Sequence, residues 1–213
     1  MKKLIFLTIL SVSTIFLESC MKKSGAAEVF ADTINTEKTR REEPVRQLNR
    51  EEILKNRNRE IVQKIKDGRF SELAEDIHLE KGIRFSMYAY VSAEDKVFSA
   101  EDYRKYVETP VRFTWGKTDG EGRDLVLNIS EYLKTWVFKR DFSNAIVTVN
   151  EFQGHGNSLN NLQEQYPEAD FTENYIAGSE KYSGMDWNSL RLVFEEFNGK
   201  FYLVAVINDQ WTI

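Results

Sequence analysis

The last part of the chain contains two apolar segments, Leu190 to Phe197 and Phe201 to Ile207, separated by Asn198-Gly199. Asn-Gly is the strongest short signal for a two-residue β-hairpin turn, because both turn positions take a positive φ. Apolar residues fill nearly every position of both segments, which predicts strands that are covered on both faces. Helices can cover one face. The other face then requires a pocket interior, a flexible N-terminal stalk or a second subunit.

Earlier segments also carry strand patterns. Residues 83–91 alternate between an apolar face and an amphipathic polar face formed by Arg84, Ser86, Tyr88 and Tyr90. Further strands are predicted at residues 97–98, 111–115, 145–152 and 170–177, with a glycine-bearing turn at 118–122.

Helix-start signals precede four segments. Asn49 with Glu52 resembles a capping box, and Gly68 ends the helix that follows. Ser71 is expected to cap a second helix through about Ile77, and the pairs Ser99/Asp102 and Asn128/Glu131 cap two more. The apolar face of the first helix comprises Ile53, Leu54, Ile61, Val62 and Ile65. These elements predict an α+β fold, with N-terminal helices packed on a curved, mainly antiparallel sheet, or roll.

The N-terminus resembles a bacterial lipoprotein signal. Lys2 and Lys3 precede an apolar run from Leu4 to Leu17, and the small residue Ser19 precedes Cys20. A helix over this run reaches about 21 Å at about 1.5 Å per residue, short of a hydrocarbon core of roughly 30 Å, so a permanent span is not expected. An ordinary secretory peptide is the alternative. Glu18 departs from the small or aliphatic residue that the commonest lipoprotein signals carry at that position.

The signal predicts the domain organisation. Residues 1–19 form the signal peptide, residues 20–48 comprise the lipidated Cys20 and a flexible stalk, and residues 49–213 form a single domain. The protein would be lipid-anchored to a bacterial cell membrane. Because Met21 is not the aspartate associated with inner-membrane retention, the outer membrane is favoured in a diderm cell.

Charge and cysteine content exclude several classes of function. Residues 51–213 carry 20 basic and 28 acidic residues, which makes nucleic acid an unsuitable partner. With Cys20 lipidated, the mature chain has no thiol for disulfides, metal binding or nucleophilic catalysis. Neither histidine, His78 or His155, lies in a zinc-binding pattern, and no phosphate-binding loop follows a strand. No metal or cofactor is predicted.

Several side chains are candidates for a site. Asp186-Trp187 and Asp209-Gln210-Trp211 flank the final hairpin, whose antiparallel strands bring these ends together. His155 lies between two glycines, which would expose its imidazole. Aromatic ligand-binding candidates are Tyr88, Tyr90, Trp115, Trp187 and Trp211. In the alternative structural interpretation, each aspartate caps a turn and each tryptophan closes the edge of the core.

The order of elements resembles the nuclear-transport-factor-2-like fold, also called a cystatin-like α+β roll. The chain is also similar to an uncharacterised group of bacterial envelope proteins. The matching stretches are Gly82-Ile83-Arg84-Phe85-Ser86, Thr114-Trp115-Gly116 with Asp119-Gly120, Gly154-His155-Gly156-Asn157, Gly184-Met185-Asp186-Trp187 and Asp209-Gln210-Trp211-Thr212-Ile213. This resemblance implies an architecture and a location, and no activity.

Two hypotheses follow. The first is a lipid-anchored, non-catalytic protein that binds a small ligand or an envelope protein, with a second copy of the chain as a further candidate partner through the sheet. The second is a small acid/base enzyme of the isomerase or dehydratase type, with Asp186 or Asp209 as base and His155 or Tyr88 as acid. The enzyme requires one of these carboxylates inside a closed cavity.

Overall fold

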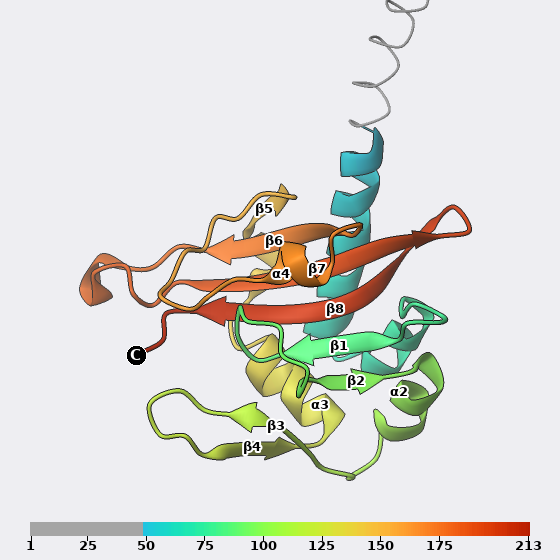
Figure 1. Ribbon diagram of the computed structural model, residues 1–213, viewed down its shortest axis with the longest axis horizontal. Helices are drawn as coiled ribbons and strands as arrows, with labels where there is room; N and C mark the ends of the chain where they lie inside the picture. Colours follow the sequence, from blue (N-terminus) through green and yellow to red (C-terminus); the bar gives the residue numbers. More distant parts are fainter. Residues whose placement is uncertain (1–48) are drawn as a thin grey trace, which may run out of the picture. The chain divides into compact units, whose positions relative to one another are not determined.

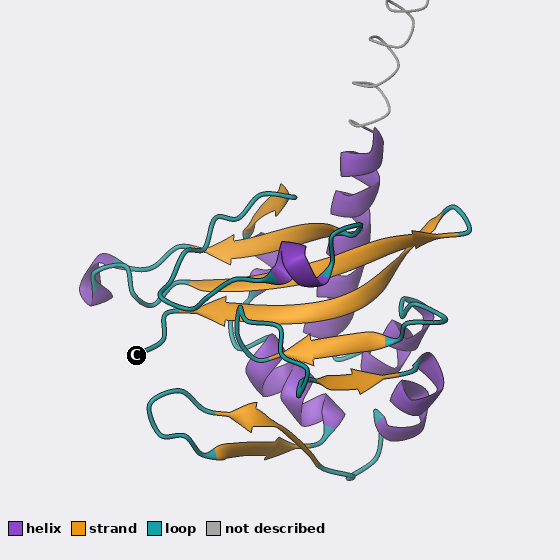
Figure 2. Ribbon diagram, viewed as in Figure 1, coloured by secondary structure: helices purple, strands orange, loops and turns teal. Residues whose placement is uncertain are grey.

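The computed structural model describes residues 49–213. The predicted signal, Cys20 and stalk lie outside the described residues. The described part is α+β, as predicted, with a mixed sheet, helices and a small second sheet (Figures 1 and 2). The six-stranded sheet has the order β2 (Lys96–Phe98), β1 (Ile83–Ser86), β8 (Lys200–Gln210), β7 (Asn188–Phe197), β6 (Asp170–Ile176) and β5 (Ile146–Val149).

Neighbouring strands of this sheet are antiparallel, except for the parallel pair β1 and β8. A separate antiparallel hairpin contains β3 (Phe113–Lys117) and β4 (Asp124–Leu127). The first described helix spans residues 49–66. The other helical elements are η1 (Phe70–Glu75), α2 (Ala100–Tyr106), α3 (Ile129–Tyr132), its π-helical continuation η2 (Leu133–Val137), η3 (Phe142–Asn144), α4 (Leu162–Gln165) and η4 (Glu180–Tyr182). No described helix has the length and apolar composition needed to cross a bilayer.

The predicted hairpin is confirmed as β7 and β8, which lie inside the sheet. Asn198 and Gly199 have φ values of 51° and 76°, as the turn requires. The register shifts between Val193 and Phe194, so that β8 carries one extra residue there. Both Val204 and Ala205 consequently pack on the same side, and the strand stays apolar on both faces.

The N-terminal helix covers one face of the sheet, and it passes behind the strands in Figure 1. Leu54, Ile61, Val62 and Ile65 are buried there with Leu190 and other residues of the main core. The prediction that Ile53 shares this apolar face is wrong, because 40% of its surface is exposed. The helix ends before Gly68, which has a φ of 71°.

The chain itself covers the other face through residues 150–169, here called the covering segment. It includes α4, which lies in front of the sheet in Figure 1. Its Leu162 packs with Phe171, Val193 and Ile207 in a second, smaller core. The sequence pattern predicted a cover but did not identify this segment.

Several predicted element boundaries are wrong. β1 ends at Ser86 instead of Val91, because the Ser86 hydroxyl donates to the carbonyl oxygens of Tyr88 (2.9 Å) and Tyr90 (3.0 Å) and bends the chain out of the ladder. β5 stops at Val149, before Asn150 turns the chain with a φ of 56°.

Two of the predicted helix caps are confirmed, and the predicted cap at Ser71 is wrong. Ser99 accepts from the Asp102 N–H, and Asn128 with Glu131 forms a complete capping box, both as predicted. Ser71 caps nothing, since η1 is a short 3-10 helix that already begins at Phe70. The strand β4 was not predicted.

The doubly buried hairpin should dominate stability. Leu192 is fully buried at its centre, so Leu192→Ala should lower the free energy of unfolding by about 2–5 kcal/mol through lost burial and cavity formation. Ile146 lies on the edge strand β5 and is 59% exposed, so Ile146→Ala should cost less than about 1 kcal/mol. Urea denaturation of both variants checks this. Equal losses would contradict the assignment of the core.

Candidate functional site

Asp209 belongs to a buried ion cluster. Arg191 donates from Nε to Glu173 (3.0 Å) and from Nη2 to Asp209 (2.7 Å). All three residues are buried, Arg191 and Glu173 completely. Burial raises the pKa of the Asp209 carboxyl, against the opposing effect of the Arg191 guanidinium. The carboxylate therefore serves as an internal counter-ion, and it is not among the residues that line the grooves described below.

The same cluster holds the covering segment in place. Arg191 Nη2 donates to the carbonyl oxygen of Gly154 (3.1 Å), and the guanidinium lies 4.9 Å from the centre of the Phe152 ring. Glu173 accepts hydrogen bonds from the backbone N–H groups of Gln153 and Gly154. The buried charges thus fix the path of the backbone that covers the second core.

Asp186 has a different and local role. Its carboxylate accepts from the Ser179 N–H (2.6 Å) and from the Ser179 hydroxyl (2.9 Å), which closes the loop that contains η4. The backbone hydrogen bond is the main reason why the pKa of Asp186 is lowered. The ends of the hairpin do meet, as predicted, since Asn188 pairs with Gln210. The two aspartates nevertheless do not form one catalytic rim.

The glycines around His155 are explained by Trp187. A Cβ atom at Gly154 would lie 2.5 Å from the Trp187 ring, and one at Gly156 would lie 3.0 Å from it. The backbone must therefore come close to the buried indole, and His155 is left exposed between the two contacts. Trp187 is buried beside Tyr175 and the covering segment, whereas Trp211 is 40% exposed.

The candidate Trp115 and the histidine His78 both have structural contacts. Trp115 is buried, stacks on Tyr132 with ring centres 3.7 Å apart, and donates from Nε1 to the Leu127 carbonyl (2.9 Å). Trp115, a ligand-binding candidate from the sequence, is therefore mainly a packing residue, although it also lines the second groove described below. His78 is buried, and its Nδ1 accepts from the N–H groups of Glu80 and Lys81 (3.2 Å each). Within residues 49–213 no three His, Cys, Asp or Glu side chains gather as a metal site.

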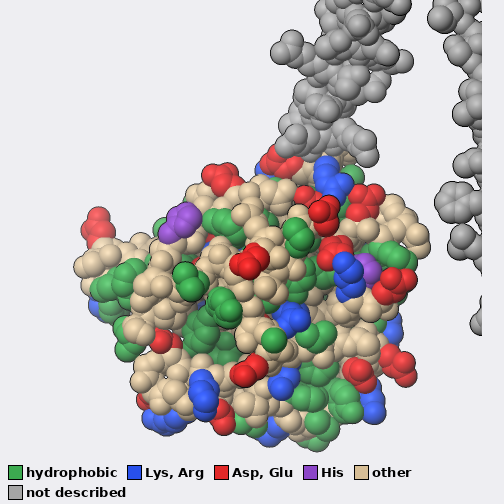
Figure 3. All heavy atoms as spheres, viewed as in Figure 1, with side chains coloured by type: hydrophobic (Ala, Val, Ile, Leu, Met, Phe, Trp, Pro, Cys, Tyr) green, Lys and Arg blue, Asp and Glu red, His purple; other side chains and the backbone are tan. Residues whose placement is uncertain are grey.

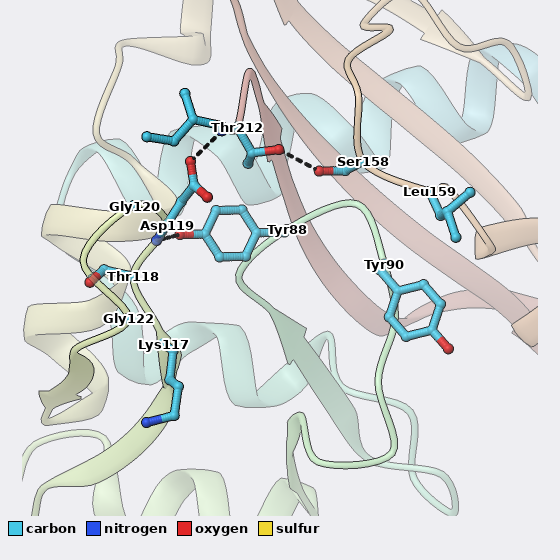
Figure 4. Close-up of a pocket in the computed structure, with 11 residues that line it drawn as sticks. Tyr88, Tyr90, Lys117, Thr118, Asp119, Gly120, Gly122, Ser158, Leu159 and Thr212 are labelled. Atoms are coloured by element: carbon cyan, nitrogen blue, oxygen red, sulfur yellow. Dashed lines mark hydrogen bonds between the residues drawn. The ribbon is translucent and has the colours of Figure 1, made fainter.

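Tyr88 and Tyr90 line an open groove of ≈ 830 Å³, here called the tyrosine groove (Figure 4). Its other walls are the β3–β4 turn, residues 158–159 of the covering segment and residues 212–213. The Tyr88 hydroxyl accepts from the Asp119 N–H (2.8 Å), whereas the Tyr90 ring points away from that turn. Burial raises the pKa of Tyr88.

Residues 212–213 are fixed between two loops. Asp119 accepts from the Ile213 N–H (2.8 Å), and the hydroxyl groups of Ser158 and Thr212 lie 2.8 Å apart (Figure 4). Asn157 also accepts from the Thr212 hydroxyl (2.8 Å). The tyrosine groove is consequently bordered by segments that are hydrogen-bonded to one another, so its shape is preorganised.

A second groove of ≈ 490 Å³, here called the wedge, lies between the chain at residues 94–96 and β3. The strands β2 and β3 are close at one end, where the rings of Phe98 and Phe113 are 5.0 Å apart. No ladder joins them within residues 49–213. A β-bulge before Gly116 redirects β3, and a Cβ atom at Gly116 would lie 2.9 Å from the Met87 sulfur. An isolated glycine in a strand is the sequence signal that could have indicated this bulge.

The wedge contains a carboxyl that the sequence did not single out. Asp95 accepts from the Ser92 N–H (2.9 Å), and burial raises its pKa. Tyr132, which stacks on Trp115, has a fully buried hydroxyl without a hydrogen-bond partner among the described residues. Burial is the main reason why the pKa of the Tyr132 phenol is raised, and the charge of Asp95 adds to it.

Lys139 follows η2 in the chain and contacts the end of β8. Its ammonium group binds the side chain of Gln210 and is 5.2 Å from the centre of the Trp136 ring. Burial lowers the pKa of Lys139 from 10.5 to about 8, although the nearby Asp209 opposes this shift. Its charged form therefore weakens the fold at neutral pH.

The buried cluster gives a matched test of the two aspartates. Asp209→Asn removes the charged acceptor of the buried Arg191 Nη2 and should lower the free energy of unfolding by about 1–3 kcal/mol. Asp186→Asn removes a charge at a solvated turn and should leave the urea midpoint almost unchanged. If Asp186→Asn proved the more damaging of the two, the assigned roles would be reversed.

Lys139 predicts a pH effect of definite sign. Between about pH 8 and 10.5 the unfolded chain holds this proton more strongly than the folded chain, so the contribution of Lys139 to stability rises with pH across that window. Lys139→Met should stabilise the protein at neutral pH and reduce the rise. Urea unfolding of both proteins at about pH 7.5 and 9.5 measures the difference. An identical pH dependence in the two proteins would refute the buried ammonium.

Comparisons with known proteins do not identify a family. No family model matches the chain, and no curated protein matches it. A solved structure of a DUF4783 family protein from Bacteroides ovatus matches with 12% identity over 70% of this chain and 91% of that chain, at a TM-score of 0.28. A likeness at that level carries no argument about function.

Proposed function

We propose that this protein is a lipid-anchored envelope protein whose tyrosine groove and wedge bind a ligand without turnover. The observation that carries the binding function is the tyrosine groove itself: an open, preorganised depression with two tyrosines in its walls. Lipid attachment through Cys20 is inferred from the N-terminal sequence alone, and so is a place on a bacterial membrane.

Binding accounts for the described residues better than catalysis by the predicted set. Asp209 is buried and hydrogen-bonded to Arg191, and Asp186 is occupied at a turn. The Tyr88 hydroxyl accepts a backbone hydrogen bond, and His155 lies beside the Trp187 contact. These four groups have separate structural surroundings, whereas acid/base chemistry requires a base and an acid that face the same substrate.

A native preparation tests the proposal. We expect intact-mass analysis of the protein from its own host to show a chain that begins at an acylated Cys20. The same preparation should contain a co-purifying molecule. Tyr90→Ala should reduce the amount of that molecule at least about tenfold, because Tyr90 is 53% exposed in the groove wall.

Tyr182→Ala is the matched control, because Tyr182 is 51% exposed and lies on η4, outside the groove. The amount of co-purifying molecule should be unchanged in this variant. Equal retention by Tyr90→Ala and the unaltered protein would contradict binding in the groove. A chain that still begins at Met1, or that is cut downstream of residue 20, would contradict the anchor.

A further inference from the structure

We infer that the tyrosine groove and the wedge together bind a neutral, hydroxyl-rich chain, that is, an oligosaccharide. This inference rests on the proposed function and specifies its ligand class. The two depressions are neighbours, because Tyr88, Tyr90 and Lys117 line both of them. A chain of several units could occupy both, with volumes of ≈ 830 and ≈ 490 Å³, whereas one compact molecule would fill only one.

The charges of the site argue against an ionic ligand. The wedge is lined by the carboxylates of Glu94, Asp95 and Asp124 and by the ammonium groups of Lys96 and Lys117. Lys117 and Asp124 already form an ion pair at 2.9 Å. The visible face in Figure 3 likewise shows acidic and basic side chains interspersed over β1 to β4, with no large area of one sign.

Hydroxyl groups fit this mixture of charges. A hydroxyl donates one hydrogen bond and accepts others. Neighbouring hydroxyls on one ligand can therefore donate to carboxylates and accept from ammonium groups. A carboxylate or phosphate ligand would meet Glu94 and Asp95 as like charges, and a cation would meet Lys96 and Lys117. The side chains that line the wedge therefore favour a ligand that is polar but carries no net charge.

The walls also present apolar surface of a suitable kind. The rings of Tyr88 and Tyr90 line the groove, and Leu159 beside them is 78% exposed. A sugar ring has an apolar C–H face and a rim of hydroxyls. It can therefore pack against an exposed aromatic or aliphatic side chain while its edge makes hydrogen bonds.

The wedge also offers uncharged hydrogen-bonding groups. Ser86 and Ser92 line it beside Asp95, and a serine hydroxyl can accept a hydrogen bond from a ligand hydroxyl. Tyr132 lies behind Trp115, is fully buried and does not line the wedge, so its phenol is not a ligand contact.

The experiment uses the full chain, purified in a detergent without a sugar headgroup. Maltotriose, cellotriose and triacetylchitotriose are the saccharide probes, and calorimetry measures binding. An octapeptide of alternating Val and Thr is the contrasting probe, since an extended peptide could instead pair with the unpaired edges of β2 and β3. The variants are Tyr90→Ala and Asp95→Asn, with Tyr182→Ala as control.

We expect at least one trisaccharide to bind, and to bind at least about tenfold more weakly to Tyr90→Ala and Asp95→Asn but not to Tyr182→Ala. Tyr90 is exposed, so its variant stays interpretable even if Asp95→Asn is destabilised. If only the peptide binds, the ligand is not an oligosaccharide and the inference is wrong. The proposed function, ligand binding in the groove, would still stand. The inference fails if neither kind of probe binds. It also fails if a saccharide binds Tyr90→Ala as tightly as it binds the unaltered protein. If, in addition, no molecule co-purifies with the native protein, the proposed function fails with it.

Discussion

β7 and β8 are buried on both faces, and the helices and loops around them must cover both sides. Leu192 on one face and Val193 on the other are both fully buried, so each side of the hairpin needs its own apolar cover. The N-terminal helix supplies one cover through a regular apolar stripe. The covering segment supplies the other with few apolar residues, and it needs additional anchoring.

That anchoring comes from buried charge. Isolated charges in a protein interior are costly, and they are tolerated here because Arg191 is shared by Glu173, Asp209 and the Gly154 carbonyl. Packing of Trp187 against Gly154 then fixes the next part of the segment. The segment consequently reaches Ser158 in a defined position, where it borders the tyrosine groove. The core and the candidate site are thus linked through one connection.

The sequence predicted those features that depend on neighbouring residues. The Asn198-Gly199 turn, the Ser99 cap and the Asn128 capping box are local patterns, and each was confirmed. For Asp209 and Trp115 the sequence left a site role and a structural role open, because their side chains alone carry no sign of their distant partners. Arg191 and the Leu127 carbonyl are those partners, and only the folded chain brings them near.

The candidate site itself could be predicted only in part. Tyr88 and Tyr90 were identified as ligand-binding candidates, and both line the groove. Asp95 was missed because it lies in a loop whose position depends on the bend at Ser86 and on the divergence of β2 from β3. A pattern that alternates through residues 83–91 gives no sign of that bend.

Native-state hydrogen exchange can show whether β7 and β8 are the most stable part of the protein, because it reports the opening free energy of each amide. Amides of Leu192, Val193 and Ala205 should exchange only through global unfolding, with the free energy found by denaturation. Amides of residues 156–160 should exchange through smaller local openings. Exchange of the β7 and β8 amides at lower free energy than those of residues 156–160 would show that burial of this hairpin on both faces does not hold the fold together.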